Sequence, residues 1–185
     1  MKYLYNLAIM SNKRSEEKCL FWKKFSNNNR NDFDNKEEII LAPMDGKVID
    51  LKNVNNSAFS EGILGDGLAI EPSSSQVVSL VDGVVSMLYD TCHGAGLSSE
   101  SGVEILIHVG MDTVELNGEG FTSRVASGQK IKKGNLLLEV DFDFIKSKGY
   151  DIVTPIVVTN MGKYKNIRKT NKTDILKGEE LFHIS

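Results

Sequence analysis

The sequence predicts an all-β protein, with a sandwich-like or barrel-like arrangement of strands and little helix. Three observations carry this prediction. Short runs rich in Val, Ile and Leu follow one another from residue 38 to the end of the chain. Gly, Asp and Ser interrupt them at intervals of roughly 8–12 residues, a spacing typical of sandwiches and barrels. Segments with the periodicity of an amphipathic helix are scarce.

The expected strands are these apolar runs taken in chain order. Each run is rich in residues that favour strands and is bounded by residues that favour turns. Within this β region, helix is expected only in two short stretches, over residues 141–151 and over residues 161–169. The strand-forming runs are EIILA, GKVIDL, LAIEP, QVVSLV, GVVSMLY, GVEILIHV, LLLEVD, IVTPIVVT and LFHIS.

A weak internal repeat relates parts of the β region. Residues 42–51 (APMDGKVIDL) resemble residues 79–88 (SLVDGVVSML), and each reads as strand, Asp-Gly turn and strand. Asp-Gly is a strong hairpin signal because glycine, here Gly46 and Gly83, tolerates positive φ. Residues 127–141 form a looser third copy. The sequence therefore predicts pseudo-symmetric hairpin repeats.

The first 36 residues differ in composition from the rest. The Asn-rich stretch FSNNNRNDFDNKEE predicts a disordered linker, and KRSEEKCLFWKKF before it predicts a short helix. The aromatic residues and lysines of that helix fit a membrane surface. A frayed terminus and an arm packed on the domain are the alternatives, and all three remain open. We expect an N-terminal extension over residues 1–36, flexible or partly helical, and one domain over residues 37–185.

Composition and charge narrow the class of protein. The formal net charge of -3 argues against a nucleic-acid partner, because such proteins usually carry a basic excess. The two cysteines, Cys19 and Cys92, lack metal-type spacing and are interpreted as free thiols in a reducing compartment. No apolar run approaches the roughly 18 residues that a membrane span needs. We therefore expect a cytoplasmic protein.

One histidine lies inside an apolar run, GVEILIHVGMDTVEL, at residues 102–116. Alternate residues of a strand point to opposite faces. His108 and Leu106 share one face, and a histidine beside an exposed aliphatic residue predicts a docking patch with a reactive centre. The opposite face is expected to pack in the core and holds Val103, Ile105, Ile107 and Val109.

A second histidine, His93, ends the run GVVSMLYDTCH. If this strand stays regular, Tyr89, Thr91 and His93 share a face and Cys92 points the other way. The loop GAGLSSESG joins this strand to that of His108, so the two imidazoles converge if the strands are neighbours. The Thr91 hydroxyl could then fix an imidazole tautomer.

Several chemistries use a pair of imidazoles. Two histidines are two ligands of an incomplete zinc site, with Glu104 or Asp112 as a possible third, but no HExxH motif is present. A nucleophile elbow, a P-loop and a Rossmann fingerprint are also absent. Phosphohistidine chemistry remains, in which one imidazole attacks a phosphoryl group and the other stabilises it. His183 has no comparable neighbours and is interpreted as a structural or surface residue.

Six motifs occur in a fixed order along residues 37–185: IILAPMDGKV, LGDGLAIEP, VVSLVDGVV, TCHGAG, SGVEILIHVGMDTVELNGEGF and VTPIVVTNM. Together they resemble the enzyme IIA domain of the glucose-type phosphoenolpyruvate:sugar phosphotransferase system. The motif from Gly102 to Phe121 is highly specific, whereas each of the others alone is weak.

The resemblance implies a phosphotransferase with a β-sandwich-like fold and no bound cofactor. It takes a phosphoryl group from the histidine phosphocarrier protein HPr and passes it to a cysteine of enzyme IIB for sugar uptake. His108 matches the phosphorylated histidine, and His93 matches the imidazole that stabilises the phosphoryl group. Thr91 matches the residue that hydrogen-bonds His93, and Gly110 matches the glycine whose carbonyl orients the phosphorylated ring. The docking face is matched by Asp112 and by an apolar patch of Phe59, Ile63, Leu64, Tyr89 and Leu106.

An alternative function remains open. In it the chain is a regulatory protein-binding module, switched by phosphorylation of the same histidine. Its partners would then include regulatory proteins. Membrane contact is expected only through the permease or, weakly, through the N-terminal segment.

Three departures from the family pattern are visible. SLVDG replaces the more usual Ala-Pro start of the second repeat, and this replacement alters the sequence of a turn. CHGAGL is glycine-rich and predicts a looser loop after His93. Asn56 and Asn117 stand where charged residues often occur, which bears on partner choice because rim charges set encounter rates.

Overall fold

The computed structural model of the protein describes residues 37–185. The predicted linker, the predicted N-terminal helix and Cys19 lie outside the described residues. The division of the chain at residue 36 therefore stays a prediction. Within the described part, no helix is long and apolar enough to cross a membrane.

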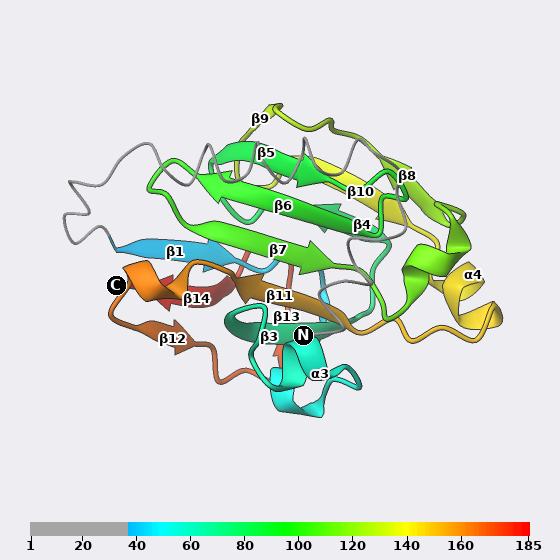
Figure 1. The fold of residues 1–185 in the computed structure, drawn as a ribbon, viewed down its shortest axis with the longest axis horizontal. Coiled ribbons are helices and arrows are strands. Elements are labelled where there is room, and N and C mark those ends of the chain that lie inside the picture. Colours follow the sequence, from blue (N-terminus) through cyan, green and yellow to red (C-terminus); the bar gives the residue numbers. More distant parts are fainter. Residues whose placement is uncertain (1–36) are drawn as a thin grey trace. The chain divides into compact units, whose positions relative to one another are not determined.

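The described residues form an all-β fold, which confirms the predicted fold class. Their largest sheet has eight strands, and all its neighbouring strands are antiparallel. Figure 1 shows three of them, β6, β7 and β11, side by side across the middle of the domain. From one edge to the other the order is β13 (Asp174–Ile175), β2 (Gly46–Asp50), β3 (Asp66–Pro72), β11 (Thr154–Val158), β7 (Glu104–His108), β6 (Gly94–Ser99), β5 (Gly83–Leu88) and β9 (Lys130–Ile131).

Two three-stranded sheets complete the described β structure. The first has the order β1 (Glu38–Leu41), β14 (Glu180–Ile184) and β12 (Ile167–Lys169), so it joins the start of the described chain to its end. The second has the order β4 (Gln76–Val78), β10 (Leu136–Val140) and β8 (Phe121–Ser123). Strands of all three sheets contribute to one main core, whose fully buried side chains include Ile40, Ile70, Leu80, Leu97, Ile107, Leu138, Ile156 and Phe182.

Helical segments in the described chain are short. Two are α-helical, α3 (Ser57–Ser60) and α4 (Phe142–Ser147). Three are 3₁₀ turns, η1 (Leu51–Asn53), η2 (Thr113–Leu116) and η3 (Met161–Lys163). Helix α4 lies where the sequence predicts one, and Asp141 caps it by accepting a hydrogen bond from the backbone N–H of Phe144 at 2.9 Å.

The second predicted helix, over residues 161–169, is wrong beyond its first turn. Residues Ile167–Lys169 form β12 and pair with β14. Strand pairing overrides the local preference here because it places the side chain of Ile167 against the main core.

The copies of the predicted internal repeat do not form the expected hairpins. β1 and β2 belong to different sheets, as do β4 and β5, and β9 and β10. Gly46 begins β2 and Gly83 begins β5, and neither has positive φ. A Cβ at Gly46 would lie 2.2 Å from the Glu71 carbonyl oxygen, and one at Gly83 would lie 2.1 Å from that of Ser98. Each glycine is required for the close approach of a partner strand at a corner between sheets, and not for a tight turn.

A second, smaller core lies on the other face of the eight-stranded sheet. Ala69 belongs to it, whereas the adjacent Leu68 and Ile70 belong to the main core, as strand alternation requires. The connection between β2 and β3, which carries η1 and α3, folds back to cover this face (Figure 1). The buried members are Leu51, Val54, Phe59, Ala69, Met111 and Val157.

Candidate functional site

His108 is the last residue of β7, and this strand alternates as predicted. The four residues of the expected core face, at positions 103, 105, 107 and 109, are each at most 2% exposed. His108 is half-buried on the opposite face. Its Cα is paired with that of Gly94 on β6, so the chain just before β6 lies next to the imidazole.

A backbone carbonyl fixes the ring of His108. The Nδ1 atom lies 2.8 Å from the carbonyl oxygen of Gly110. A carbonyl only accepts hydrogen bonds, so Nδ1 carries the hydrogen and Nε2 keeps a free lone pair. The nucleophilic nitrogen of this ring is therefore Nε2.

The loop after β7 is itself held in place, which sets the direction of the Gly110 carbonyl. The N–H of Met111 donates to the Asp151 carbonyl oxygen at 2.9 Å, and the Thr113 hydroxyl donates to that of Val109 at 2.6 Å. Gly110 has φ 72, a conformation that favours glycine. Thr113 and the backbone of Asp151 are positioning elements that the sequence pattern did not reveal, because their contacts join separate loops.

His93 lies directly before β6, and the predicted regular strand through it is wrong. β5 ends at Leu88, and the chain turns where the Cys92 N–H donates to the Tyr89 carbonyl oxygen at 2.8 Å. Cys92 has φ 55, within the left-handed region. Most of the expected loop GAGLSSESG is strand β6. The two imidazoles nevertheless converge, with ring centroids 5.0 Å apart and planes at 74°.

Two neighbours hold the ring of His93, which is only 3% exposed. The Thr91 hydroxyl oxygen lies 2.5 Å from Nδ1, as the resemblance implied for this pair. The Tyr89 ring stacks on the imidazole, with centroids 4.8 Å apart and planes at 21°. Nδ1 is thus occupied, and Nε2 is the nitrogen that remains for another group.

Both imidazoles are neutral at physiological pH. Burial, together with the nearby His108, lowers the pKa of His93 from 6.5 to about 4. Burial also lowers the pKa of His108, although the hydrogen bond to the Gly110 carbonyl and the charge of Asp112 oppose this shift. A neutral ring keeps the lone pair that a nucleophile needs.

The expected docking residues divide between the surface and the second core. Ile63 is 58% exposed, and Asp112 is exposed next to the loop of Gly110. Leu64 and Leu106 are half-buried and pack against the second core. Of these apolar residues, Ile63 therefore offers the most exposed side chain.

The resemblance places Phe59 in the docking patch, but its side chain offers little exposed surface to a partner. It is 3% exposed, because α3 turns its side chain into the second core. Its ring meets that of His108 edge to face, with centroids 5.5 Å apart and planes at 62°. Phe59 therefore packs against the His108 imidazole from the second core.

The departures from the family pattern have local structural explanations. Asn56 caps α3, its side chain accepting a hydrogen bond from the Ala58 N–H at 3.0 Å. Asn117 ends η2 with φ 50, which asparagine tolerates better than most residues. Gly94 and Gly96 are buried in β6, so the glycine-rich stretch is packed strand and not a loose loop. In the second repeat, the Ser79 hydroxyl donates to the Val81 carbonyl oxygen at 2.7 Å.

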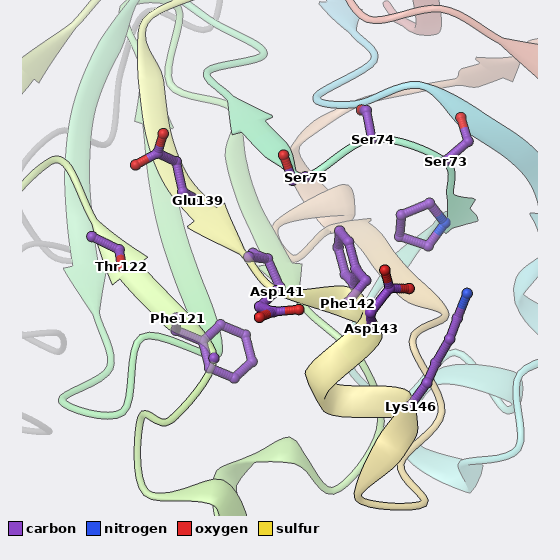
Figure 2. A pocket seen from close by; sticks show the side chains of 13 residues that line it. Ser73, Ser74, Ser75, Phe121, Thr122, Glu139, Asp141, Phe142, Asp143 and Lys146 are labelled. Atoms are coloured by element: carbon purple, nitrogen blue, oxygen red, sulfur yellow. The ribbon is translucent and has the colours of Figure 1, made fainter.

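The described residues contain no group of three or more His, Cys, Asp or Glu side chains arranged to hold a metal ion. A hollow of about 760 Å³ lies away from the histidine pair, beside α4 and the serine turn at residues 73–75. Figure 2 shows its polar lining, with Glu139, Asp141, Asp143 and Lys146. None of the residues expected at the site lines this hollow.

Comparison with known proteins gives one consistent class, a phosphotransferase component built on this β fold. Residues 38–164 match the family described as phosphoenolpyruvate-dependent sugar phosphotransferase system, EIIA 1. The glucose-specific EIIA component of Buchnera aphidicola is 40% identical over 141 residues, covering 76% of this chain and 88% of that protein. Glucose permease IIA from Mycoplasma capricolum has a similar structure, with a TM-score of 0.76, 38% identity, and coverage of 80% of this chain and 96% of that one.

A longer relative contains the same domain. The β-glucoside-specific EIIBCA component of Halalkalibacterium halodurans is 42% identical over 149 residues, which is 80% of this chain but 23% of that protein. This chain therefore spans about a quarter of the length of that relative.

The chain belongs to the EIIA family of the phosphoenolpyruvate-dependent sugar phosphotransferase system. EIIA components are phosphotransferase relay proteins that pass phosphoryl groups to EIIB in sugar uptake, and this chain is such a phosphocarrier.

Proposed function

We propose that Nε2 of His108 carries the phosphoryl group. One observation supports this assignment above the others: Nδ1 is committed to the Gly110 carbonyl at 2.8 Å, while Nε2 keeps its lone pair on a partly exposed ring. The lone pair attacks the phosphorus, the bond to the donor nitrogen breaks, and the donor keeps its electron pair. In a second transfer an acceptor thiolate attacks the phosphorus, the bond from phosphorus to Nε2 breaks, and His108 regains its lone pair.

His93 stabilises the phosphoryl group in this proposal. When the Thr91 hydroxyl donates to Nδ1 of His93, the ring hydrogen is on Nε2 and can be donated to a phosphoryl oxygen. The ring separation of 5.0 Å leaves room for such a bridge. The lowered pKa of His93 keeps the ring neutral, so it stabilises without the strong attraction of a full positive charge. The phosphoryl group therefore stays transferable.

The partners follow from the relay. We propose that HPr supplies the phosphoryl group and that a cysteine of an EIIB domain receives it, in the cytoplasm. Ile63 follows Phe59, whose ring contacts His108, by four residues, and the charge of Asp112 acts on His108; both side chains are exposed and offer an apolar contact with a charged rim. Such an interface is small and transient, as a carrier with successive partners requires.

Incubation with phosphoenolpyruvate, enzyme I and HPr tests the proposal. The protein should acquire an acid-labile phosphate that His108→Ala abolishes. His93→Ala should still accept phosphate but transfer it to EIIB slowly. As a matched control, His183→Ala replaces a histidine in β14 that contacts Arg168 and Glu37, and it should behave as wild type. Labelling that survives the loss of His108 would overturn the assignment.

A further inference from the structure

We infer that Tyr89 and Gly94 act together as a positioning unit for His93, in which the glycine makes room for the tyrosine ring to hold the imidazole in plane. The inference rests on the proposed function of the histidine pair. It assigns Tyr89 a role inside the domain, in addition to the docking contact that the resemblance implies.

Tyr89 and Gly94 face each other across the turn that leads to His93. The N–H of Tyr89 donates to the Gly94 carbonyl oxygen at 3.1 Å, and the Cys92 N–H closes the turn on Tyr89 at 2.8 Å. Residues directly opposite each other on antiparallel strands bring their side chains together. Because Gly94 has no side chain, the Tyr89 ring can fold over its backbone and reach the imidazole.

The space above Gly94 is fully used by this ring. A Cβ at Gly94 would lie 2.6 Å from Cδ2 and 2.7 Å from Cε2 of Tyr89. Any side chain at this position would therefore displace the ring. Tyrosine packing over a strand glycine compensates for the side chain that the glycine lacks. Gly94, in the glycine-rich stretch after His93, thus leaves the space into which the Tyr89 ring packs.

The displaced ring would no longer hold His93. The Tyr89 ring stacks on the imidazole at 4.8 Å and 21°, which fixes the plane of the imidazole. The Thr91 hydroxyl, 2.5 Å from Nδ1, fixes how the imidazole is turned within that plane. The two contacts together fix the orientation of Nε2 of His93, in a ring whose centroid lies 5.0 Å from that of His108. Hydrogen bonds to a transferring phosphoryl group depend on such placement.

Nitrogen-15 NMR of the His93 ring tests the inference in the unphosphorylated protein. We expect one tautomer, with the hydrogen on Nε2, in the wild type and in Tyr89→Phe, which keeps the stacked ring. Tyr89→Leu and Gly94→Ala should both show mixed tautomers, as should Thr91→Val, the reference for a loosened ring. In the relay assay Tyr89→Leu and Gly94→Ala should transfer the phosphoryl group to EIIB more slowly than wild type, by roughly threefold to tenfold, the range expected for one aromatic pair.

Gly96→Ala is the matched control, because it makes the same substitution two residues further along β6. Its Cβ would meet Ser86 Oγ at 3.0 Å and would not touch Tyr89. The double variant Tyr89→Leu/Gly94→Ala should be no worse than Tyr89→Leu alone, since the two residues act as one unit. A single wild-type tautomer in Tyr89→Leu, or a Gly96→Ala defect equal to that of Gly94→Ala, would overturn the inference. The tautomer measurement needs no phosphoryl donor, so it separates this failure from a failure of the proposed function.

Discussion

A single hydrogen bond joins His108 to the backbone two residues later: Nδ1 donates to the Gly110 carbonyl oxygen at 2.8 Å. The acceptor belongs to the main chain, so its direction depends on the conformation of Gly110 and on the loops that hold it. The choice between two chemically similar ring nitrogens thus depends on backbone geometry.

Gly110→Ala should disturb this geometry more than an ordinary glycine substitution. Gly110 has φ 72, and a Cβ there would lie 2.6 Å from Thr113 Cγ2 and 2.7 Å from the Asp151 carbonyl oxygen. We expect a loss in the free energy of unfolding well above about 1 kcal/mol, and slower phosphorylation of His108. Urea unfolding and the relay assay measure the two effects.

Gly128→Ala provides the control for that prediction. Gly128 has φ 85, but a Cβ there would meet nothing within 4 Å. This variant therefore carries the same kind of backbone strain without the steric contacts. If both variants lose equal stability and Gly110→Ala is phosphorylated normally, the loop does not position the carbonyl.

Stability should depend on pH through His93. The pKa of this histidine is about 6.5 in the unfolded chain, and burial in the folded protein lowers it to about 4. The unfolded state binds more protons in this interval, so the free energy of unfolding decreases as the pH falls through it. The full effect is about 3 kcal/mol, at roughly 1.4 kcal/mol per pH unit.

A comparison with His93→Gln isolates this contribution. The variant keeps His108, whose lowered pKa acts in the same direction, but lacks the titrating group of interest. Urea unfolding at several values between pH 7 and pH 4 should show a shallower pH dependence than in wild type. Parallel curves for the two proteins would refute a strongly lowered pKa for His93.

Phe59 and Ile63, both expected on the docking face, should respond differently to substitution. Phe59 is 3% exposed in the second core, so Phe59→Ala should lower the free energy of unfolding by about 3 kcal/mol or more. Ile63 is 58% exposed, so Ile63→Ser should change it by no more than about 0.5 kcal/mol and weaken HPr or EIIB binding instead. If Phe59→Ala and Ile63→Ser destabilise the protein equally in thermal unfolding, the division into a core Phe59 and a surface Ile63 is wrong.

The sequence predicted what depends on local pattern. Alternation in β7 separated Ile107, which faces the core, from His108, and the capped stretch after Asp141 gave α4. The all-β class followed from the same alternation and from the spacing of turn residues. These features need only neighbours along the chain.

Features that depend on distant segments were missed. The Asp-Gly pairs suggested hairpins, but Gly46 is required by the carbonyl of Glu71 on a neighbouring strand. The resemblance placed Phe59 in the docking patch, and nothing local shows that α3 buries its side chain over the eight-stranded sheet. The stacking of Tyr89 on His93 was not predicted, because it exists only once the chain turns at Cys92.

The central claim is that Nε2 of His108 is the phosphorylated atom, and NMR of the phosphorylated, nitrogen-15-labelled protein tests it most directly. The phosphorus–nitrogen coupling identifies which ring nitrogen bears the phosphoryl group. We predict that coupling at Nε2 of His108, with Nδ1 still protonated by its bond to the Gly110 carbonyl. Coupling at Nδ1 of His108, or at either nitrogen of His93, would contradict the account.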